Sequence, residues 1–256
     1  MSNEILVAPE NGVLTITIDR PARKNALTTA MYQAMADALN GANNDASVRA
    51  ALLRGHAEIF TAGNDIEDFL KGPPAGADSP VIRFLDAIAA FEKPLVAAVK
   101  GPAIGVGTTL LLHCDMVYAA ESARFAVPFA QLGLCPEAAS SLLLPRIAGY
   151  QGAAEKLLLG ETFDAVEAHR MGFVNRVLPA AELDAFVSGQ LAKLVALPAS
   201  SLRVTKSLMK RGDTHEVKTR MSEEFVHFGK MLLAPEAREA FTAFLEKRKP
   251  DFRQFD

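Results

Sequence analysis

The 256-residue chain is poor in the residues that mark several protein classes. It has no Trp and only two Cys, Cys114 and Cys135, which lie in apolar sequence. We therefore expect small buried thiols there, and neither a disulfide nor metal ligands. No apolar run approaches the roughly 18 residues of a membrane span. The net charge of −3 argues against a nucleic-acid surface.

Neither end of the sequence carries a recognised targeting signal. The start, Met-Ser-Asn-Glu-Ile, has no basic segment leading into an apolar core, as a signal peptide would have. The end, Arg-Gln-Phe-Asp, does not match the Ser-Lys-Leu peroxisomal signal. With two thiols expected to stay reduced, the sequence predicts a cytoplasmic protein that has no membrane partner.

Three chemistries find no support in the motifs. No His-Glu-x-x-His spacing is present, so no metal site is predicted from the five histidines, which are His56, His113, His169, His215 and His227. The glycines between Gly101 and Gly107 lack the Lys-Ser/Thr of a phosphate-binding P-loop and the spacing of a dinucleotide fingerprint. Ser140 and Ser141 lack the Gly-x-Ser-x-Gly turn of a serine hydrolase.

What the chain does contain is typical of a globular α/β protein. Half of its residues are apolar and 22% are charged. A hairpin turn at Asn11-Gly12 separates two strand patterns. Strands are predicted at 5–8, 13–18, 48–54, 95–99, 116–120 and 174–178. Helices are predicted at 28–44, 81–91, 153–159, 164–171, 181–196, 200–210, 217–232 and 235–249, with short ones ending near Phe69 and beginning near Thr108. Alternating strands and helices favour helices packed on sheets, followed by a helical C-terminal third.

Glu137 is the only charged side chain between Phe125 and Pro145. Burial among apolar residues would raise the pKa of this carboxyl group and make it a stronger proton acceptor. Such carboxylates collect at functional sites. The alternative is structural: Glu137 would lie in the first turn of a helix that begins near Ala138, where the helix dipole favours a negative charge.

Two glycine-containing turns, Phe60–Asp65 and Gly101–Gly107, each lead into a helix. Glycines let the backbone approach a ligand closely, and helix N-termini offer unpaired N–H donors. Two such N–H groups directed at one oxygen form an oxyanion hole, which together with a nearby base suits proton abstraction next to a thioester carbonyl. The alternative is that both turns are only tight connections.

These segments resemble the crotonase (enoyl-CoA hydratase/isomerase) superfamily over nearly the whole chain. The resemblance is carried in order by Ile16–Leu27, Phe60-Thr-Ala-Gly-Asn-Asp-Ile66, Lys100–Gly107, Gly172–Val177 and Phe244–Phe252. It implies a crotonase-like α/β fold, a spiral of ββα repeats over residues 1–196, with a helical trimerisation region at 197–256. It also implies a homotrimer or a hexamer made of two trimers, and an acyl-CoA thioester substrate. Coenzyme A would be part of that substrate, and no separate cofactor is expected.

The resemblance also assigns site residues. The backbone N–H groups of Asn64 and Val106 would form the oxyanion hole. Thr61 to Asp65 would line the pantetheine, and Arg23 and Lys24 would lie near the CoA nucleotide. Phe244 and Lys247 match positions near the CoA of an adjoining subunit, although Lys247 could equally be a solvated charge at a helix end. The expected substrate-binding residues are Arg23, Lys24, Ala26, Thr61, Ala62, Gly63, Asp65, Ile66, Gly105, Gly107, Phe129, Phe244 and Lys247. The Lys71–Pro80 loop and the following helix would border the acyl pocket.

One departure from the hydratase pattern decides the expected reaction. The two glutamates that hydratases use to position and split water would fall at Thr109 and Phe129, and neither residue is an acid. Glu137 instead lies in the string Leu-Gly-x-x-Pro-Glu-x-x-Ser-Ser, which is similar to the peroxisomal-type Δ3,Δ2-enoyl-CoA isomerases. Glu137 would be the proton carrier. The alternatives are a hydratase or another acyl-CoA lyase or hydrolase, and an acyl-CoA-binding protein without catalysis.

Overall fold

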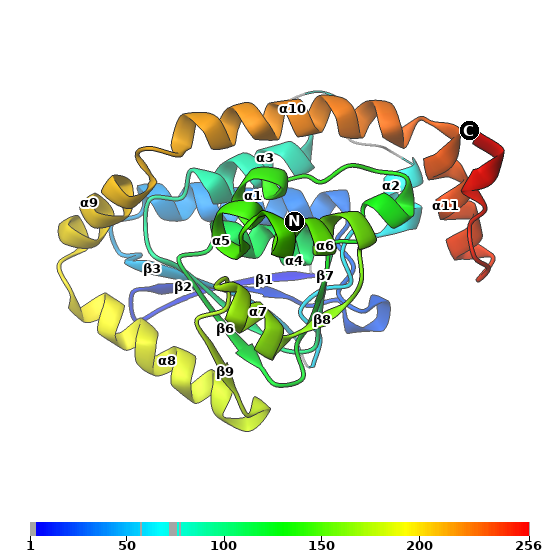
Figure 1. Ribbon diagram of the computed structural model, residues 1–256. Coiled ribbons are helices and arrows are strands. Elements are labelled where there is room, and N and C mark those ends of the chain that lie inside the picture. The colour runs from blue at the N-terminus through cyan, green and yellow to red at the C-terminus, as the bar shows by residue number, and fades with distance from the viewer. Residues whose placement is uncertain (1–3, 57, 72–75, 77, 256) are drawn as a thin grey trace.

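The computed structural model describes residues 4–56, 58–71, 76 and 78–255 and is built around a six-stranded sheet (Figure 1). The strand order is β1-β2-β3-β4-β6-β9. The first pair is antiparallel and the other four pairs are parallel. The strands are β1 (Ile5–Glu10), β2 (Val13–Ile18), β3 (Ala50–Gly55), β4 (Leu95–Val99), β6 (Met116–Ala120) and β9 (Arg176–Leu178).

The predicted hairpin is confirmed. Asn11 and Gly12 both have positive φ, at 49° and 80°, which matches the twist that a two-residue connection between antiparallel strands requires. Ile5 pairs with Ile18 at the open end of this hairpin. The pair forms one edge of the main sheet.

Alternate residues of the central strands face two different layers of helices. Leu53 and Ala97 belong to a core cluster shared with α1 (Thr29–Asn44) and α3 (Pro80–Ala89). Their sequence neighbours Leu52 and Val96 pack instead with α8 (Ala180–Ala196), on the other side. Since side chains of a strand alternate between faces, both faces of the central strands are covered, and all five residues of β4 are buried.

A smaller three-stranded sheet corrects the sequence reading of the second glycine turn. Its order is β5-β7-β8, and β5 lies inside the segment expected to be only a turn. Three residues are too few to show a strand period, and β5 forms because it pairs in parallel with β7. Phe125 and Phe163 pack within this sheet, with ring centroids 5.7 Å apart. The strands are β5 (Pro102–Ile104), β7 (Arg124–Ala126) and β8 (Phe163–Asp164).

The remaining helices follow the predicted pattern with shifted ends. They are α2 (Ile66–Lys71), α4 (Val106–Thr109), α5 (Ser140–Ala148), α6 (Tyr150–Leu159), α7 (Ala165–Met171), α9 (Ala199–Lys210), α10 (Thr214–Leu232) and α11 (Pro235–Leu245). The last helix ends four residues before the predicted Lys249, because Lys247 adopts a left-handed conformation with φ 55°. Within the predicted Lys71–Pro80 loop, residues 72–75 and 77 lie outside the described part of the chain.

The long helix α10 runs along one side of the molecule, over α3 and α5 (Figure 1). Its buried residues Val217 and Met221 join the main core, and Phe228 packs in a separate cluster with Phe129 and Phe241. The C-terminal helices therefore pack directly on the α/β part of this same chain. This packing brings α10 next to the segment that carries Glu137.

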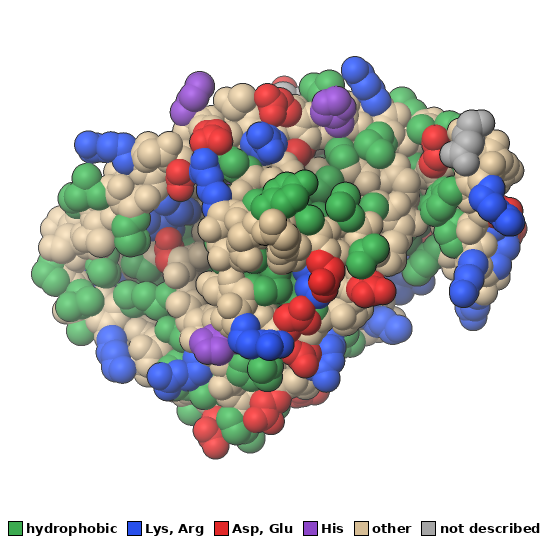
Figure 2. Space-filling view, viewed as in Figure 1, with side chains coloured by type: hydrophobic (Ala, Val, Ile, Leu, Met, Phe, Trp, Pro, Cys, Tyr) green, Lys and Arg blue, Asp and Glu red, His purple; other side chains and the backbone are tan. Residues whose placement is uncertain are grey.

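Several large apolar side chains remain exposed on the surface of the chain. On α6 and α7 these are Tyr150, Leu158, Leu159 and Val166. Figure 2 shows hydrophobic side chains gathered over the middle of this face and basic ones at the α11 end. Among the described residues, no single helix has the length and apolar composition of a membrane span. Helices α8 and α9 have them only when taken together, and the chain bends by 105° between the two.

Candidate active site

The structure tests the structural interpretation of Glu137, which places this residue in the first turn of a helix. Helix α5 begins at Ser140, so Glu137 lies before the helix rather than in its first turn. Ala138 and Ala139, which follow it, both have left-handed backbones, with φ of 59° and 55°. The helix-dipole interpretation is therefore wrong. The chain turns sharply after Glu137 and leaves its side chain free to face a cavity.

Glu137 and Asn64 line a cavity of about 270 Å³. The Thr109 hydroxyl donates a short hydrogen bond to the Glu137 carboxylate. Burial raises the pKa of Glu137 to about 8; the Thr109 hydrogen bond acts against this shift, and the charge of Glu224 adds to it. The Glu137 carboxyl group therefore exchanges a proton near neutral pH, as a general acid-base group requires.

The raised pKa predicts that Glu137 costs the protein stability. Above the ordinary value of 4.5 an unfolded chain releases this proton, whereas the folded chain keeps it until pH 8, so stability falls as the pH rises through that window. We expect Glu137→Gln to be more stable than the wild type by about 2–5 kcal/mol at pH 8.5, with the difference vanishing near pH 4.5. Unfolding in urea at both pH values measures this. Equal stabilities at pH 8.5 would contradict the raised pKa.

The two glycine turns lie against each other. The Thr61 N–H donates to the Pro102 carbonyl at 2.9 Å, and the Ile104 N–H donates to the Thr61 carbonyl at 3.0 Å. Gly63 has φ 92°, and a Cβ there would meet the Ile104 oxygen at 2.8 Å. A Cβ on Gly107 would lie 2.5 Å from the Thr61 methyl group. Glycine is therefore required at both turns by close contact, and the contact brings Asn64 near the start of α4.

Both N–H groups that the resemblance assigned to the oxyanion hole lack a protein acceptor within the described part of the chain. The Leu27 N–H donates to the Gly63 carbonyl, and the Asp65 N–H donates to the Leu27 carbonyl. Both backbone bonds to Leu27 are therefore made by the residues before and after Asn64. No hydrogen bond is formed by the Asn64 N–H itself. Val106 is the first residue of α4, and its N–H has no acceptor within the helix. Two free donors thus lie on adjoining turns.

A tyrosine that the sequence interpretation missed contacts the first of these turns. The buried Tyr32 of α1 donates a short hydrogen bond from its hydroxyl to the side-chain oxygen of Asn64, and it lines the same cavity. Burial, with a contribution from the Glu137 charge, holds the pKa of Tyr32 well above 10. A neutral phenol therefore stays a donor to Asn64. Tyr32 lies beside the apolar stripe of its helix, and the sequence gives no signal for this role.

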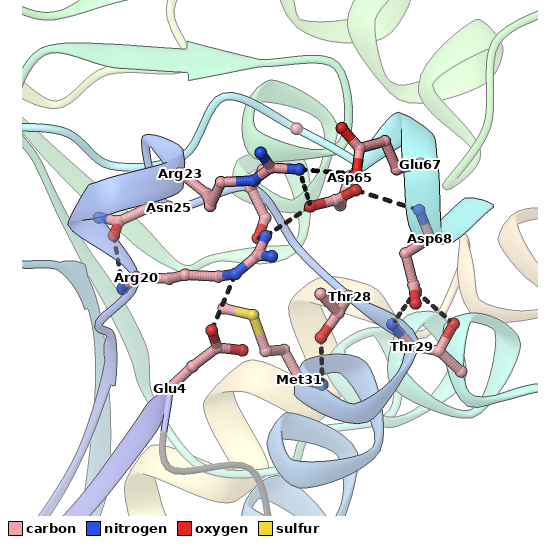
Figure 3. Close-up of polar contacts among 12 residues, drawn as sticks. Glu4, Arg20, Arg23, Asn25, Thr28, Thr29, Met31, Asp65, Glu67 and Asp68 are labelled. Carbon is pink, nitrogen blue, oxygen red and sulfur yellow. Dashed lines mark hydrogen bonds and ion pairs between the residues drawn. The ribbon is translucent and has the colours of Figure 1, made fainter. Parts of the chain in front are cut away.

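Asp65 has a structural role that the resemblance did not assign. Its carboxylate, 6% exposed, pairs with Arg20 at 2.6 Å and accepts the Asp68 N–H at 3.1 Å (Figure 3). Arg20 also pairs with Glu4 at 2.8 Å. Burial would raise the pKa of Asp65, but the Arg20 hydrogen bond and charge outweigh it and hold that pKa below its usual value. The carboxylate therefore anchors the turn next to Asn64. Substrate binding by Asp65 remains a prediction.

The residues expected near coenzyme A surround the same turn. Arg23 is half exposed and pairs with Glu67 at 3.0 Å. Lys24 is exposed, and its carbonyl accepts the Ala62 N–H at 3.0 Å. The Ala26 carbonyl accepts a hydrogen bond from Arg20 at 3.0 Å. Figure 3 shows Arg20 together with Arg23 and Asn25. The structure thus gathers these expected residues at one turn, and their contact with a substrate remains a prediction.

The other expected substrate-binding residues are scattered. Phe129 is buried and packs on Phe228, with ring centroids 6.3 Å apart, and Ile66 packs on the same cluster. Gly105 precedes α4. Phe244, 61% exposed, and Lys247 lie on and after α11, away from the residues that line the cavity. A single chain does not test the prediction that these last two act on an adjoining subunit.

The cavity walls are mostly apolar. Helices α3 and α10 supply the walls, including Leu85, Met221 and Phe225. The helix predicted at 81–91 thus borders this cavity, and the binding of an acyl chain there stays a prediction. A second carboxylate, Asp86 of α3, lies at the exposed rim, where partial desolvation by the neighbouring atoms raises its pKa. Such a cavity suits an acyl chain better than a charged group.

The structure also describes the two cysteines and the groups that could bind a metal ion. Within residues 4–56, 58–71, 76 and 78–255, no cluster of three His, Cys, Asp or Glu side chains is placed to hold a metal ion. Cys114 and Cys135 are free thiols and are partly buried. Burial raises their pKa values to about 12 and 11, so both stay protonated near neutral pH.

Comparison with known proteins identifies the family. The profile of the enoyl-CoA hydratase/isomerase family matches residues 8–255. The chain belongs to this family. The predicted crotonase membership is confirmed, and with it the α/β crotonase fold with a helical C-terminal region.

Individual relatives carry different activities in their names. Enoyl-CoA delta isomerase 2 of Rattus norvegicus is 36% identical over 97% of this chain, and the matched region spans 65% of the rat protein. The 2,3-dehydroadipyl-CoA hydratase of Escherichia coli K12 is 33% identical over 98% of this chain and 99% of its own. A crystal structure of an enoyl-CoA hydratase/isomerase from Pseudoalteromonas atlantica T6c is 45% identical, with a TM-score of 0.93, covering 98% of this chain and 100% of that one. The family is thereby shown, and the specific reaction is not.

Proposed function

We propose that this protein is a Δ3,Δ2-enoyl-CoA isomerase, which moves the double bond of a 3-enoyl-CoA to the 2-trans position. The observation that carries this proposal is the contact between Thr109 and Glu137. The position where a hydratase would carry its first glutamate holds a hydroxyl that donates to the Glu137 carboxylate. Glu137 is thereby left as the acid-base group beside the turns that bear the two free N–H donors.

The proposed reaction needs one proton carrier. Glu137 removes a proton from C2, and the electrons of that C–H bond move onto the thioester oxygen, giving a dienolate. The N–H groups of Asn64 and Val106 hold the negative oxygen; removing one such donor typically costs about 10²–10³ in kcat. The same proton then returns from Glu137 to C4, and the double bond is left between C2 and C3. A carboxyl group with a pKa of about 8 serves as base and then as acid.

The surroundings of Phe129 also support isomerisation over hydration. Hydration needs a second group to position and activate water. Phe129 stands at the position of the second hydratase glutamate and is buried against Phe228. Asp86 also lines the cavity, but from its exposed rim. Hydration is kept as the second candidate function because a relative that matches this chain over nearly its full length is named a hydratase.

Turnover of a 3-enoyl-CoA separates an enzyme from an acyl-CoA-binding protein. Purified protein is mixed with a 3-enoyl-CoA, and formation of the conjugated 2-enoyl thioester is followed by its ultraviolet absorbance. We expect multiple turnovers per active site. Tight binding of the acyl-CoA with no product after many minutes would favour the binding protein and overturn the proposal.

The proposed role of Glu137 sets the pH dependence of the reaction. The base must be ionised, so kcat/KM should rise about tenfold per pH unit below pH 8 and level off above it. This ratio reports the pKa values of the free enzyme. A rising limb near pH 4 to 5 would mean that the titrating carboxyl group has an ordinary pKa, and it would contradict the raised pKa of Glu137.

A further inference from the structure

Glu224 is a buried carboxylate that the proposed reaction does not use. It lies on α10 and is 6% exposed. It accepts hydrogen bonds from the Ala139 N–H at 2.6 Å, from the Ser141 N–H at 3.0 Å and from the Ser141 hydroxyl at 2.5 Å. All three donors belong to the segment that follows Glu137, which runs from Ala139 into the first turn of α5. A buried charge needs such donors, and here they come from one short segment.

That segment holds a conformation it would not adopt alone. Ala138 and Ala139 are consecutive left-handed residues, and each such non-glycine residue costs of the order of 1–3 kcal/mol. The conformation persists because neighbouring elements hold it. Glu224 accepts the N–H of Ala139, and the ring of His113 contacts the Ala138 carbonyl at 2.8 Å. Since a carbonyl only accepts, the His113 ring donates from Nε2. Burial lowers the pKa of His113 to about 4 and keeps it neutral.

We propose that Glu224 is a positioning residue for Glu137. From the C-terminal helix α10 it fixes the segment 138–141, at the start of α5, so that the Glu137 side chain is directed into the cavity. The inference rests on the proposed function, since it takes Glu137 to be the base. It assigns to α10 a part in the acid-base chemistry beyond forming a wall of the acyl pocket.

The charge of Glu224 also acts on the Glu137 carboxyl group. The other groups that face Glu137 are the Thr109 hydroxyl from α4, Tyr32 from α1, Cys135 from its own segment, and His113, which is held by the adjoining loop carbonyl. Burial keeps all three titratable groups of this set neutral near pH 7. Arg220 donates a hydrogen bond to the Ser141 hydroxyl, and its positive charge acts on Glu224. The negative charge of Glu224 thus raises the pKa of Glu137.

The decisive variant is Glu224→Gln, because it removes the negative charge. Its amide NH2 group would also replace the oxygen that accepts the Ala139 N–H, and two donors repel each other. We expect kcat for the 3-enoyl-CoA to fall about 10- to 100-fold, as a small misplacement of a catalytic group does. The midpoint of the kcat/KM pH profile should move about one unit below that of the wild type, because a nearby like charge has been removed. Glu223→Gln makes the same charge change on the adjacent, exposed residue, and its midpoint should match the wild type.

Two further variants separate position from charge and serve if Glu224→Gln does not fold. Glu224→Asp keeps the charge but is one methylene shorter, so kcat should fall about tenfold or more while the midpoint stays near pH 8. Ser141→Ala removes one donor and should lower kcat several-fold with KM unchanged. Unchanged kcat in both, or an unchanged midpoint in a folded Glu224→Gln, would overturn the inference. Glu137→Gln is assayed beside them, because full activity of that variant would overturn the proposed function itself.

Discussion

Replacing Glu137 with glutamine should lower kcat/KM for isomerisation of a 3-enoyl-CoA by about 10³-fold or more, since removal of a general acid-base group typically costs 10²–10⁴. The amide keeps the size of the side chain and can still accept the Thr109 hydrogen bond, but it cannot carry a proton from C2 to C4. Binding should change little, because the acyl pocket and both oxyanion donors are untouched. Steady-state kinetics and the affinity for a saturated acyl-CoA measure the two effects.

Asp86 provides the matched comparison for this experiment. It is the other carboxylate that lines the described cavity, and it lies at the exposed rim. Asp86→Asn should lower kcat/KM less than tenfold if Glu137 is the proton carrier. A larger loss in Asp86→Asn than in Glu137→Gln would assign the proton transfer to Asp86 and contradict the mechanism.

Replacing Gly63 with alanine should have the second-largest effect, although it changes no chemical group. The added Cβ would lie 2.8 Å from the Ile104 carbonyl oxygen, and φ at this residue is 92°. The turn must therefore shift, and the N–H of Asn64 moves with it. We expect kcat to fall about 10²–10³-fold, the typical cost of one oxyanion donor, with a smaller change in KM because the donor acts mainly on the dienolate.

A glycine elsewhere separates this effect from the cost of a methyl group. Gly189 lies within α8, and a Cβ there meets no atom within 4 Å. Gly189→Ala should leave kcat unchanged and stabilise its helix by up to about 1 kcal/mol. If a folded Gly63→Ala variant kept kcat within threefold of Gly189→Ala, the Asn64 N–H would not contribute to catalysis.

Short-range patterns in the sequence predicted the elements that have a strong period or a defined turn. The Asn11-Gly12 hairpin and the helix at 28–44 were both recognised from local sequence, and the structure shows both. The strand β5 was missed because three residues between glycines have no measurable period, and it exists only through pairing with β7. Local sequence thus predicted most helices and strands, whereas β5 depends on pairing with a strand distant in the sequence.

The candidate site divides in the same way. Glu137 was predictable because a lone carboxylate in an apolar segment is unusual, and the glycine turns were predictable from their composition. The partners Tyr32 and Glu224 were not, since they come from helices 105 residues before and 87 residues after Glu137 along the chain. Nothing in the local sequence of either residue indicates its contact. Only the fold, which lays α1 and α10 over this segment, reveals them.

The product formed from a 3-enoyl-CoA in ¹⁸O-labelled water tests most directly whether Glu137 moves a proton without adding water. Wild-type protein is incubated with the 3-enoyl-CoA and, in a separate reaction, with the 2-trans-enoyl-CoA, and the thioesters from each are analysed by mass spectrometry. The mechanism predicts 2-trans-enoyl-CoA without ¹⁸O as the main product. No turnover of the 3-enoyl-CoA, together with 3-hydroxyacyl-CoA carrying ¹⁸O formed from the 2-trans-enoyl-CoA, would contradict it and assign hydration to this site.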